Sequence, residues 1–538
     1  MHQIKLGSSV PIALFLALTA CSSEPNGGTT KPPGSGGQAG APTSGGSTAT
    51  SGGKSASGGS GGASGGATNG SGGVSPSGGS TSGSGGTTVG GSMTAGGSAG
   101  TAGVAAGGTQ ASGGANTSGG SSALGGTSSG GTGAIAGTSS SGGMAGSTGI
   151  AGASGTGGSA GGGSMHWVGT WACGPQTTET NNLPPSPGLS GNTLRQYVHV
   201  TIPGKQLRIR LSNEFGTSPV TFESVHVAAS KGGGAIDTAT DKTLAFSGMP
   251  NVTVPAGKTV LSDMFDYNLP ALSDLAISIK FGTQSGDVTG HPGSRTTSYL
   301  QSGNAVSEAS LASAAKTDHW YFITGVDVMA PESAAAIVVL GDSISDGRGS
   351  TTNGNDRWPD ALAKRLQANA ATANVAVLNQ GIGGNTVLAG GLGPTAKARF
   401  DRDVLGQTGA KWLIIFEGVN DIGNNSTGNV ANDLIAAFGQ FIEKAHAKNM
   451  KVFGAPITPF AGSQYDSSAH ETTRQTVNQW IRTSGKFDAV IDLDAAVRDP
   501  NKQTALLGSY ESADKDHLHL GPAGYKAMAD AVDLTLFK

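Results

Sequence analysis

The chain has almost no cysteine. Its 538 residues include two, Cys21 and Cys173. Cys173 stands in the run Gly-Thr-Trp-Ala-Cys-Gly, which offers no partner for nucleophilic chemistry. We expect it to be a small buried apolar residue rather than a catalytic thiol.

Charge of one sign is also lacking, because 32 basic and 35 acidic residues give a formal net charge of −3. A nucleic-acid-binding protein would show a basic excess on one face, and nothing in this chain indicates one. Long apolar runs are missing too. The run from Val10 to Leu18 is too short to span a bilayer as a mature helix.

The N-terminus reads as an export signal, with Lys5 before the apolar run and Leu18-Thr-Ala-Cys21 after it. Leu-Thr-Ala-Cys resembles the lipobox of bacterial lipoproteins, which implies cleavage after residue 20 and lipidation of Cys21. Several acyl chains there would anchor the protein stably to the cell envelope. Ser22, where Asp would favour the inner membrane, points to the outer membrane or cell surface. The alternative is an ordinary signal peptide with a chance cysteine.

Residues 21–164 are dominated by Gly, Ser, Thr and Ala. From Pro25 onward this segment has no aromatic residue, and its charged side chains are Lys31 and Lys54 alone. Such a composition buries too little apolar surface to offset chain entropy. We expect a disordered tether with an r.m.s. span of roughly 60–70 Å. The sequence leaves its glycosylation open.

Residues 165–330 carry the alternating pattern of β-strands. Leu207, Ile209 and Leu211 alternate with two arginines, and residues 275–281 repeat the pattern. Each alternation predicts one apolar and one solvent face, and Gly, Pro, Asn and Asp punctuate the gaps. We predict an all-β sandwich, resembling a jelly roll.

Residues 331–538 follow a different pattern, in which short apolar runs alternate with helical stretches. The runs are 337–340, 375–378, 412–416, 452–457 and 489–493. Trp358, Leu362 and Leu366 share one helical face, as do residues 434–445 at similar spacing. Five strands alternating with helices predict an α/β fold with a parallel, doubly wound sheet, whose functional loops follow the strand ends.

Four polar motifs fall after these predicted strands. They are Gly341-Asp342-Ser343, the glycine loop 379–386, Gly418-Val-Asn420-Asp421 and Asp516-His-Leu-His519. Ester hydrolysis through a serine requires a nucleophile, a base, a group that orients the base, and donors for the oxyanion. Ser343, His519 and Asp516 fit the first three roles. The backbone N–H groups of Ser343 and Gly384 and the amide of Asn420 fit the fourth.

These four blocks resemble those of the SGNH (GDSL-type) hydrolases in residues and in order. The resemblance covers 337–537. It implies a flavodoxin-like three-layer sandwich, the site roles given above, and no metal or cofactor. The preceding all-β part resembles the jelly-roll domain that stands before this module in some carbohydrate acetylesterases.

For the base and for the glycine oxyanion donor, the sequence offers a second candidate each. Asp514-Lys-Asp-His517 is also an Asp-x-x-His, but the run from His519 to Tyr525 matches the family's entry into its last helix, with Gly521 as a departure. Gly383 competes with Gly384, which the family's Gly-Asp/Asn-Thr ending favours. His517 and His519 could form a metal pair, yet no third ligand stands at suitable spacing, so we predict no metal site.

For the residues near these motifs, structural roles compete with functional ones. Asp342 and Asp421 fit turn or helix capping better than acid catalysis. Trp167 and Trp171 fit packing better than a sugar-stacking platform. Glu417 fits substrate contact and a structural hydrogen bond equally well.

The sequence thus predicts an exported, lipid-anchored serine esterase acting on small-molecule or polysaccharide esters, with acetyl esters of carbohydrates preferred. One alternative is a lysophospholipase or thioesterase type of acyl hydrolase. The other is a catalytically inactive surface protein that binds carbohydrate. The sequence leaves the oligomeric state open.

Overall fold

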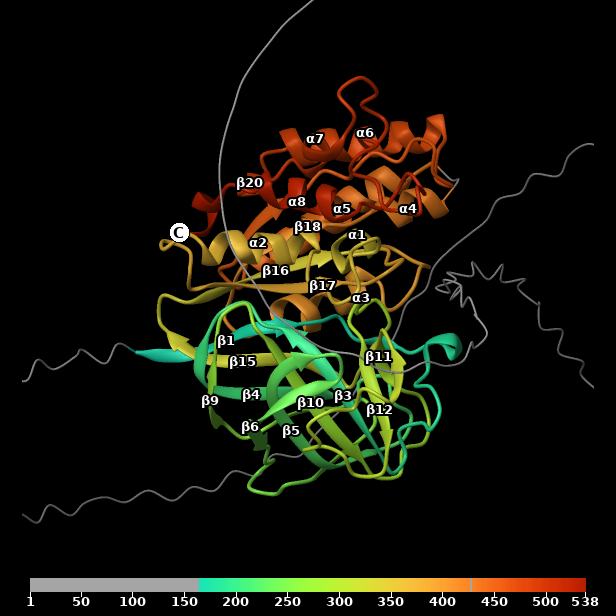
Figure 1. Cartoon of the computed structure of the whole chain (residues 1–538). Coiled ribbons are helices and arrows are strands. Elements are labelled where there is room, and N and C mark those ends of the chain that lie inside the picture. The colour runs from blue at the N-terminus through green and yellow to red at the C-terminus, as the bar shows by residue number, and fades with distance from the viewer. Residues whose placement is uncertain (1–163, 426–427) are drawn as a thin grey trace, which may run out of the picture. The chain divides into compact units, whose positions relative to one another are not determined.

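The computed structural model describes residues 164–425 and 428–538 (Figure 1). The expected signal peptide, Cys21 and all of the expected tether except Ser164 lie outside the described residues. Among the helices of the described part, none has both the length and the apolar character needed to cross a membrane.

Residues 164–331, here called the β-rich region, consist of antiparallel strands. The first sheet has the order β1-β15-β4-β8 with β9 beside β4, the second β13-β12-β3-β10-β5-β6 with β7 beside β5, and the third β14-β11-β2. The elements are β1 (Met165–Ala172), β2 (Gln176–Thr177), η1 (Thr180–Asn182), β3 (Asn192–His199), β4 (Gly204–Ser212), β5 (Val220–Gly232), β6 (Ala235–Thr243), β7 (Val252–Val254), β8 (Thr259–Leu261), β9 (Phe265–Leu269), β10 (Asp274–Phe281), β11 (Thr289–His291), β12 (Ser298–Ser302), β13 (Ala315–Thr317), β14 (Trp320–Tyr321) and β15 (Ile323–Pro331).

The alternating pattern places one face of each strand in the core, as on β4, where Leu207, Ile209 and Leu211 are fully buried. The expectation of a solvent-exposed second face is wrong for β10, because Ala276 and Ser278 are buried as well. A second, smaller apolar cluster covers that face. Buried Arg195 holds the covering segment by donating to the carbonyl oxygens of Val306 and Glu308 at 3.0 and 2.8 Å.

Residues 335–538, here called the α/β region, contain a five-stranded parallel sheet of order β17-β16-β18-β19-β20. This arrangement confirms the predicted fold class. The strands are β16 (Ala335–Gly341), β17 (Val375–Gly381), β18 (Ala410–Phe416), β19 (Lys451–Gly454) and β20 (Ala489–Val490). The helices are α1 (Ser343–Asp346), α2 (Trp358–Gln367), α3 (Ala396–Phe400), η2 (Asp401–Leu405), α4 (Val419–Asn424), α5 (Val430–His446), α6 (Ser468–Thr483), α7 (Leu493–Val497), α8 (Pro522–Asp530) and η3 (Leu534–Phe537).

The predicted helical stripe is confirmed on α2, where Trp358, Leu362 and Leu366 are fully buried. The fourth strand is shorter than predicted and ends at Gly454. Beyond it the chain leaves the sheet, and the backbone N–H of Ile457 donates to the side chain of Asn478 at 2.7 Å.

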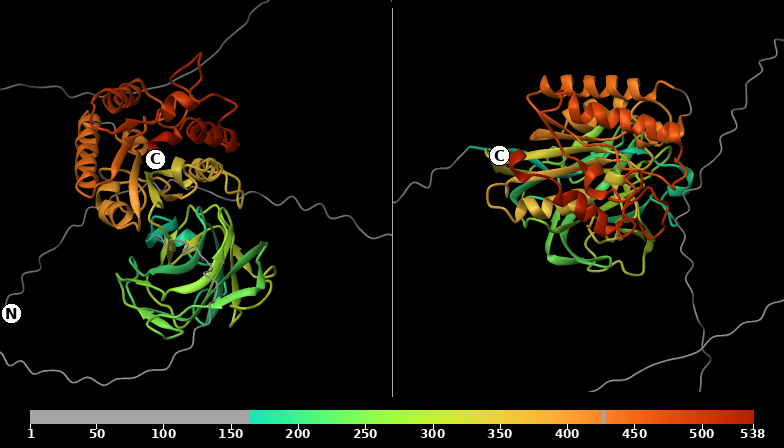
Figure 2. Two further views of the ribbon diagram at one scale, coloured as in Figure 1. Left: turned by 90° about the vertical axis from the view of Figure 1, so that its left-hand side faces the viewer. Right: turned by 90° about the horizontal axis from the view of Figure 1, so that it is seen from above.

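The two regions share one continuous apolar core rather than meeting at a polar seam. Strand β1 packs beside β17, the edge strand of the parallel sheet. Figures 1 and 2 show the β-rich region lying directly against the α/β region. Polar contacts reinforce this packing, since Thr201 Oγ1 accepts the N–H of Val377 at 3.2 Å and Thr408 donates to Asp327 at 3.0 Å.

Candidate active site

Ser343 is the first residue of α1, directly after the central strand β16. Asp342 caps this helix, because its carboxylate accepts the N–H of Ile344 at 2.9 Å, as its capping interpretation predicts. Gly341 must lack a side chain, since a Cβ there would lie 2.2 Å from Ser345 Oγ. This tight strand-to-helix turn carries Ser343 to the carboxyl edge of the sheet.

A chain of two short hydrogen bonds joins the three residues predicted for nucleophilic chemistry. Ser343 Oγ lies 2.7 Å from His519 Nε2, and His519 Nδ1 lies 2.6 Å from Asp516 Oδ2. Asp516 Oδ1 also accepts the backbone N–H of His519 at 2.8 Å. Because a carboxylate can only accept, Nδ1 carries the hydrogen and Nε2 is free to accept the serine proton.

The charges around His519 suit its role as a general base. Burial lowers the pKa of His519, and Asp516 only partly offsets that effect, while Arg348 and Arg295 lower it further. Although burial opposes it, the hydrogen bond and charge of His519 hold the pKa of Asp516 well below its usual range. At neutral pH the imidazole is therefore uncharged and the carboxylate ionised.

The three expected oxyanion donors lie on neighbouring turns. Asn420, near the start of α4, donates from Nδ2 to the carbonyl oxygen of Asn385 at 2.8 Å, which ties it to the residue after Gly384. Tyr465 donates to Asn420 Oδ1 at 2.9 Å and so fixes the orientation of the amide. The N–H of Ser343 has no intrahelical acceptor because it opens α1.

The structure also distinguishes Gly384 from Gly383 and His519 from His517, the pairs that compete for the same role. The N–H of Gly383 donates to Asp346 Oδ2 at 3.0 Å, whereas that of Gly384 has no hydrogen-bond acceptor within the described part of the chain. His517 lies 3.1 Å from Glu511 through Nδ1 and is half-exposed, whereas the histidine that contacts Ser343 is His519. Gly521 caps α8 without a side-chain hydrogen bond.

Asp421 supports the glycine loop rather than the substrate. Its two carboxylate oxygens accept the N–H groups of Val387 and Leu388 at 2.8 and 2.9 Å. Burial raises its pKa to about 6, against the opposing effect of these two donors. The carboxylate thus fixes the segment that follows Gly384 and Asn385.

Arg399 is a fully buried hub that the sequence did not reveal. Its guanidinium donates to the strand-end carbonyls of Gly341 at 3.0 Å and Gln380 at 2.6 Å, and to Asn385 Oδ1 at 3.0 Å. It also forms ion pairs with Glu417 at 3.2 Å and Asp403 at 3.3 Å. Glu417 is therefore a buried structural group, which resolves its two interpretations against substrate contact.

Other predicted neighbours are structural. Trp171 is buried and packs edge-on against Trp320 with ring centroids 4.9 Å apart. Cys173 is buried as expected, and burial raises the pKa of its thiol well above the usual value. Across residues 164–425 and 428–538, no three His, Cys, Asp or Glu side chains gather as a metal site.

Tyr465, Arg399 and Arg295 are the residues that sequence reasoning missed. Each joins the site from an element distant in sequence, so no local spacing marks it. The short Asp-x-x-His and Gly-x-Asn-Asp blocks, by contrast, carry their geometry within a few residues.

Comparisons with known proteins bear on the α/β region. Residues 339–527 match the model of the GDSL-like Lipase/Acylhydrolase family. No curated protein sequence matches this chain.

Several solved structures are similar. An acetylxylan esterase from Geobacillus stearothermophilus is 21% identical, with 37% of this chain and 94% of that chain covered and a TM-score of 0.29. A family two carbohydrate esterase from Cellvibrio japonicus is 12% identical, with 69% and 97% covered and a TM-score of 0.28. The family model matches the part of the chain that holds all four polar blocks. Residues 339–527 form a GDSL-like lipase/acylhydrolase domain.

Proposed function

We propose that the protein is a serine esterase that hydrolyses carboxylic esters through an acyl-Ser343 intermediate. The observation that carries the proposal is the hydrogen-bond chain from Ser343 through His519 to Asp516, at 2.7 and 2.6 Å. A serine, a neutral imidazole and an ionised carboxylate in this order provide a nucleophile, its base and the group that orients the base.

In the first half-reaction, Ser343 Oγ attacks the ester carbonyl carbon as its proton passes to His519 Nε2. The carbonyl oxygen becomes an oxyanion that accepts from the N–H groups of Ser343 and Gly384 and from Asn420 Nδ2. His519 then gives its proton to the departing alcohol, which leaves the acyl-enzyme. Water deprotonated by His519 attacks that ester in turn, releasing the acid and restoring Ser343.

Short acyl esters of carbohydrates are the proposed substrates. The side chains that border the His519–Asp516 pair are polar and accessible: Arg348 is 37%, His517 45% and Asp514 64% exposed. Leu392, 49% exposed, is an apolar side chain beside Gly384. Exposed polar side chains near the pair and an apolar side chain beside Gly384 suit a sugar alcohol and a small acyl group. The expected export and lipid anchor at Cys21 would place the enzyme where such polymers occur.

Hydrolysis of p-nitrophenyl esters from acetate to long-chain acyl groups, and of acetylated xylan, tests this function. We expect Ser343-dependent turnover that falls steeply beyond short acyl groups and is faster on the acetylated polysaccharide. A long-chain preference would instead indicate a lysophospholipase or thioesterase type of enzyme. Binding of carbohydrate without any turnover would indicate a non-catalytic surface protein.

A further inference from the structure

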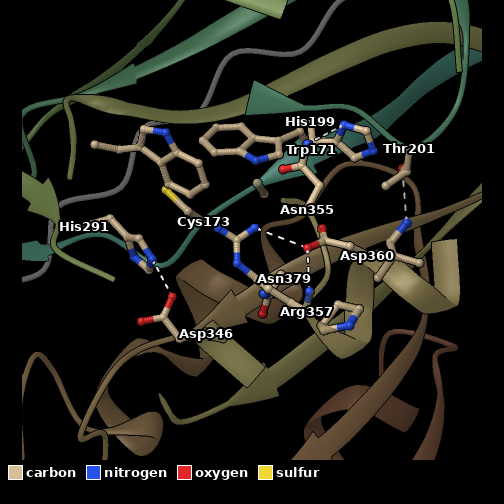
Figure 3. Close-up of a pocket in the computed structure, with 14 residues that line it drawn as sticks. Trp171, Cys173, His199, Thr201, His291, Asp346, Asn355, Arg357, Asp360 and Asn379 are labelled. Atoms are coloured by element: carbon tan, nitrogen blue, oxygen red, sulfur yellow. Dashed lines mark hydrogen bonds and ion pairs between the residues drawn. The ribbon is translucent and has the colours of Figure 1, made fainter. Parts of the chain in front are cut away.

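A buried pair of side chains connects the β-rich region to the catalytic helix. His291, the last residue of β11, places Nε2 at 2.8 Å from Oδ1 of Asp346, the last residue of α1. The side chains are 3% and 6% exposed. Figure 3 shows the two facing each other across the boundary between the regions.

The second oxygen of Asp346 holds the glycine loop. Oδ2 accepts the N–H of Gly383 at 3.0 Å, one residue before the proposed oxyanion donor Gly384. The loop lies directly against α1, since a Cβ on Gly381 would come within 2.4 Å of the backbone nitrogen of Asp346. One carboxylate therefore links β11 to the peptide that precedes the oxyanion donor.

His291 is itself held on its other edge and on its ring face. Its Nδ1–H donates to the carbonyl oxygen of Gly174 at 2.8 Å, and the ring stacks on Trp320 with centroids 5.6 Å apart. Since a carbonyl only accepts, the contact between Nε2 and Asp346 needs a hydrogen of its own.

The loop after β11 is shaped to make this approach. A Cβ on Gly293 would lie 1.7 Å from Asp346 Oδ2 and 2.4 Å from its Cγ. Only a glycine leaves room for the carboxylate here. The neighbouring cavity in Figure 3 is about 30 Å³, which holds roughly two waters and is too small for a sugar. The contact is therefore not a second substrate site.

We propose that His291 is a positioning residue of the esterase, acting through Asp346 on the Gly383–Gly384 peptide. This inference rests on the proposed function. It makes the β-rich region a part of the catalytic unit, which directs one oxyanion donor, rather than a separable binding module. A small displacement of such a donor costs transition-state stabilisation and leaves ground-state binding largely intact.

His291→Phe keeps an aromatic ring on Trp320 and removes both hydrogen bonds. We expect kcat to fall on the order of 10- to 100-fold with KM within about threefold, because a misplaced oxyanion donor acts on the transition state. Gly293→Ala, which deletes no buried group but crowds the carboxylate, should lower kcat in the same way. In an Asp346→Ala background His291→Phe should have little further effect.

Thr408→Val is the matched control, because it breaks a hydrogen bond between the regions at Asp327, away from the glycine loop. It should leave kcat unchanged. Unchanged kcat in folded His291→Phe and Gly293→Ala proteins, with Ser343→Ala inactive, would overturn the inference and spare the proposed function. An equal loss in Thr408→Val would also overturn it. Activity that survives Ser343→Ala would overturn the proposed function instead.

Discussion

In the α/β region, the side chains proposed to act on the ester stand on turns at the carboxyl edge of one sheet, whereas the β-rich region reaches the site through the loop after β11. Strand β11 ends at His291 beside Asp346, and the loop that follows carries Arg295, whose charge lowers the pKa of His519. Under the proposed function, one region supplies the reacting groups and the other adjusts them. Changes in the first should abolish turnover, and changes in the second should modulate it.

The largest effect is expected from Ser343→Ala. Removal of the nucleophile should lower kcat on the order of 10⁴-fold or more while the protein stays folded, because within residues 164–425 and 428–538 His519 is the one side chain that hydrogen-bonds to Ser343. Steady-state hydrolysis of p-nitrophenyl acetate measures this. A loss below tenfold would break the assignment of chemistry to the α/β region.

Arg399→Gln should destabilise the α/β region by about 3–5 kcal/mol, because it leaves buried Glu417 without its cation, whereas Asp403 keeps its ion pair with Arg402. Chemical denaturation measures the loss in free energy of unfolding. Lys444→Gln, at an exposed ion pair with Asp401, is the control and should change stability by under about 1 kcal/mol. Equal effects of the two changes on the free energy of unfolding would contradict a stabilising role of buried Arg399.

Asn420→Ala should lower kcat on the order of 10²- to 10³-fold, since one oxyanion donor is worth about 3–4 kcal/mol. Tyr465→Phe, which only frees the amide to rotate, should give a smaller loss of the same kind. KM should change little in both variants. A larger loss in Tyr465→Phe than in Asn420→Ala would show that Tyr465 acts directly on the substrate.

Arg295→Gln should give the smallest effect, a shift in pH dependence. The activity rises as His519 loses its proton, and burial puts that pKa below the ordinary histidine value. Removing a nearby positive charge favours the imidazolium, so the pKa rises and the acid limb of kcat/KM moves to higher pH. A limb that stays in place or moves to lower pH would show that the β-rich region does not reach His519.

The parts that could be predicted from sequence are those whose signal is local. The continuous apolar run before Ser343 marks a strand that is buried along its whole length, and the three-residue spacing of Asp516 and His519 already contains their contact. Arg399 looks like any arginine on a short helix, and its burial depends on three strand ends that meet only in the fold. His291 and Tyr465 escaped for the same reason. The covered face of β10 could not be foreseen either, because the segment held by Arg195 carries no strand pattern.

Covalent trapping shows directly whether Ser343 is the nucleophile. The protein would be treated with a fluorophosphonate, which forms a stable adduct with an activated serine, and the labelled peptide identified by mass spectrometry. We expect one adduct, on Ser343, formed in step with the loss of esterase activity and blocked by His519→Ala. Loss of activity with the label on another residue, or full activity with Ser343 labelled, would contradict it.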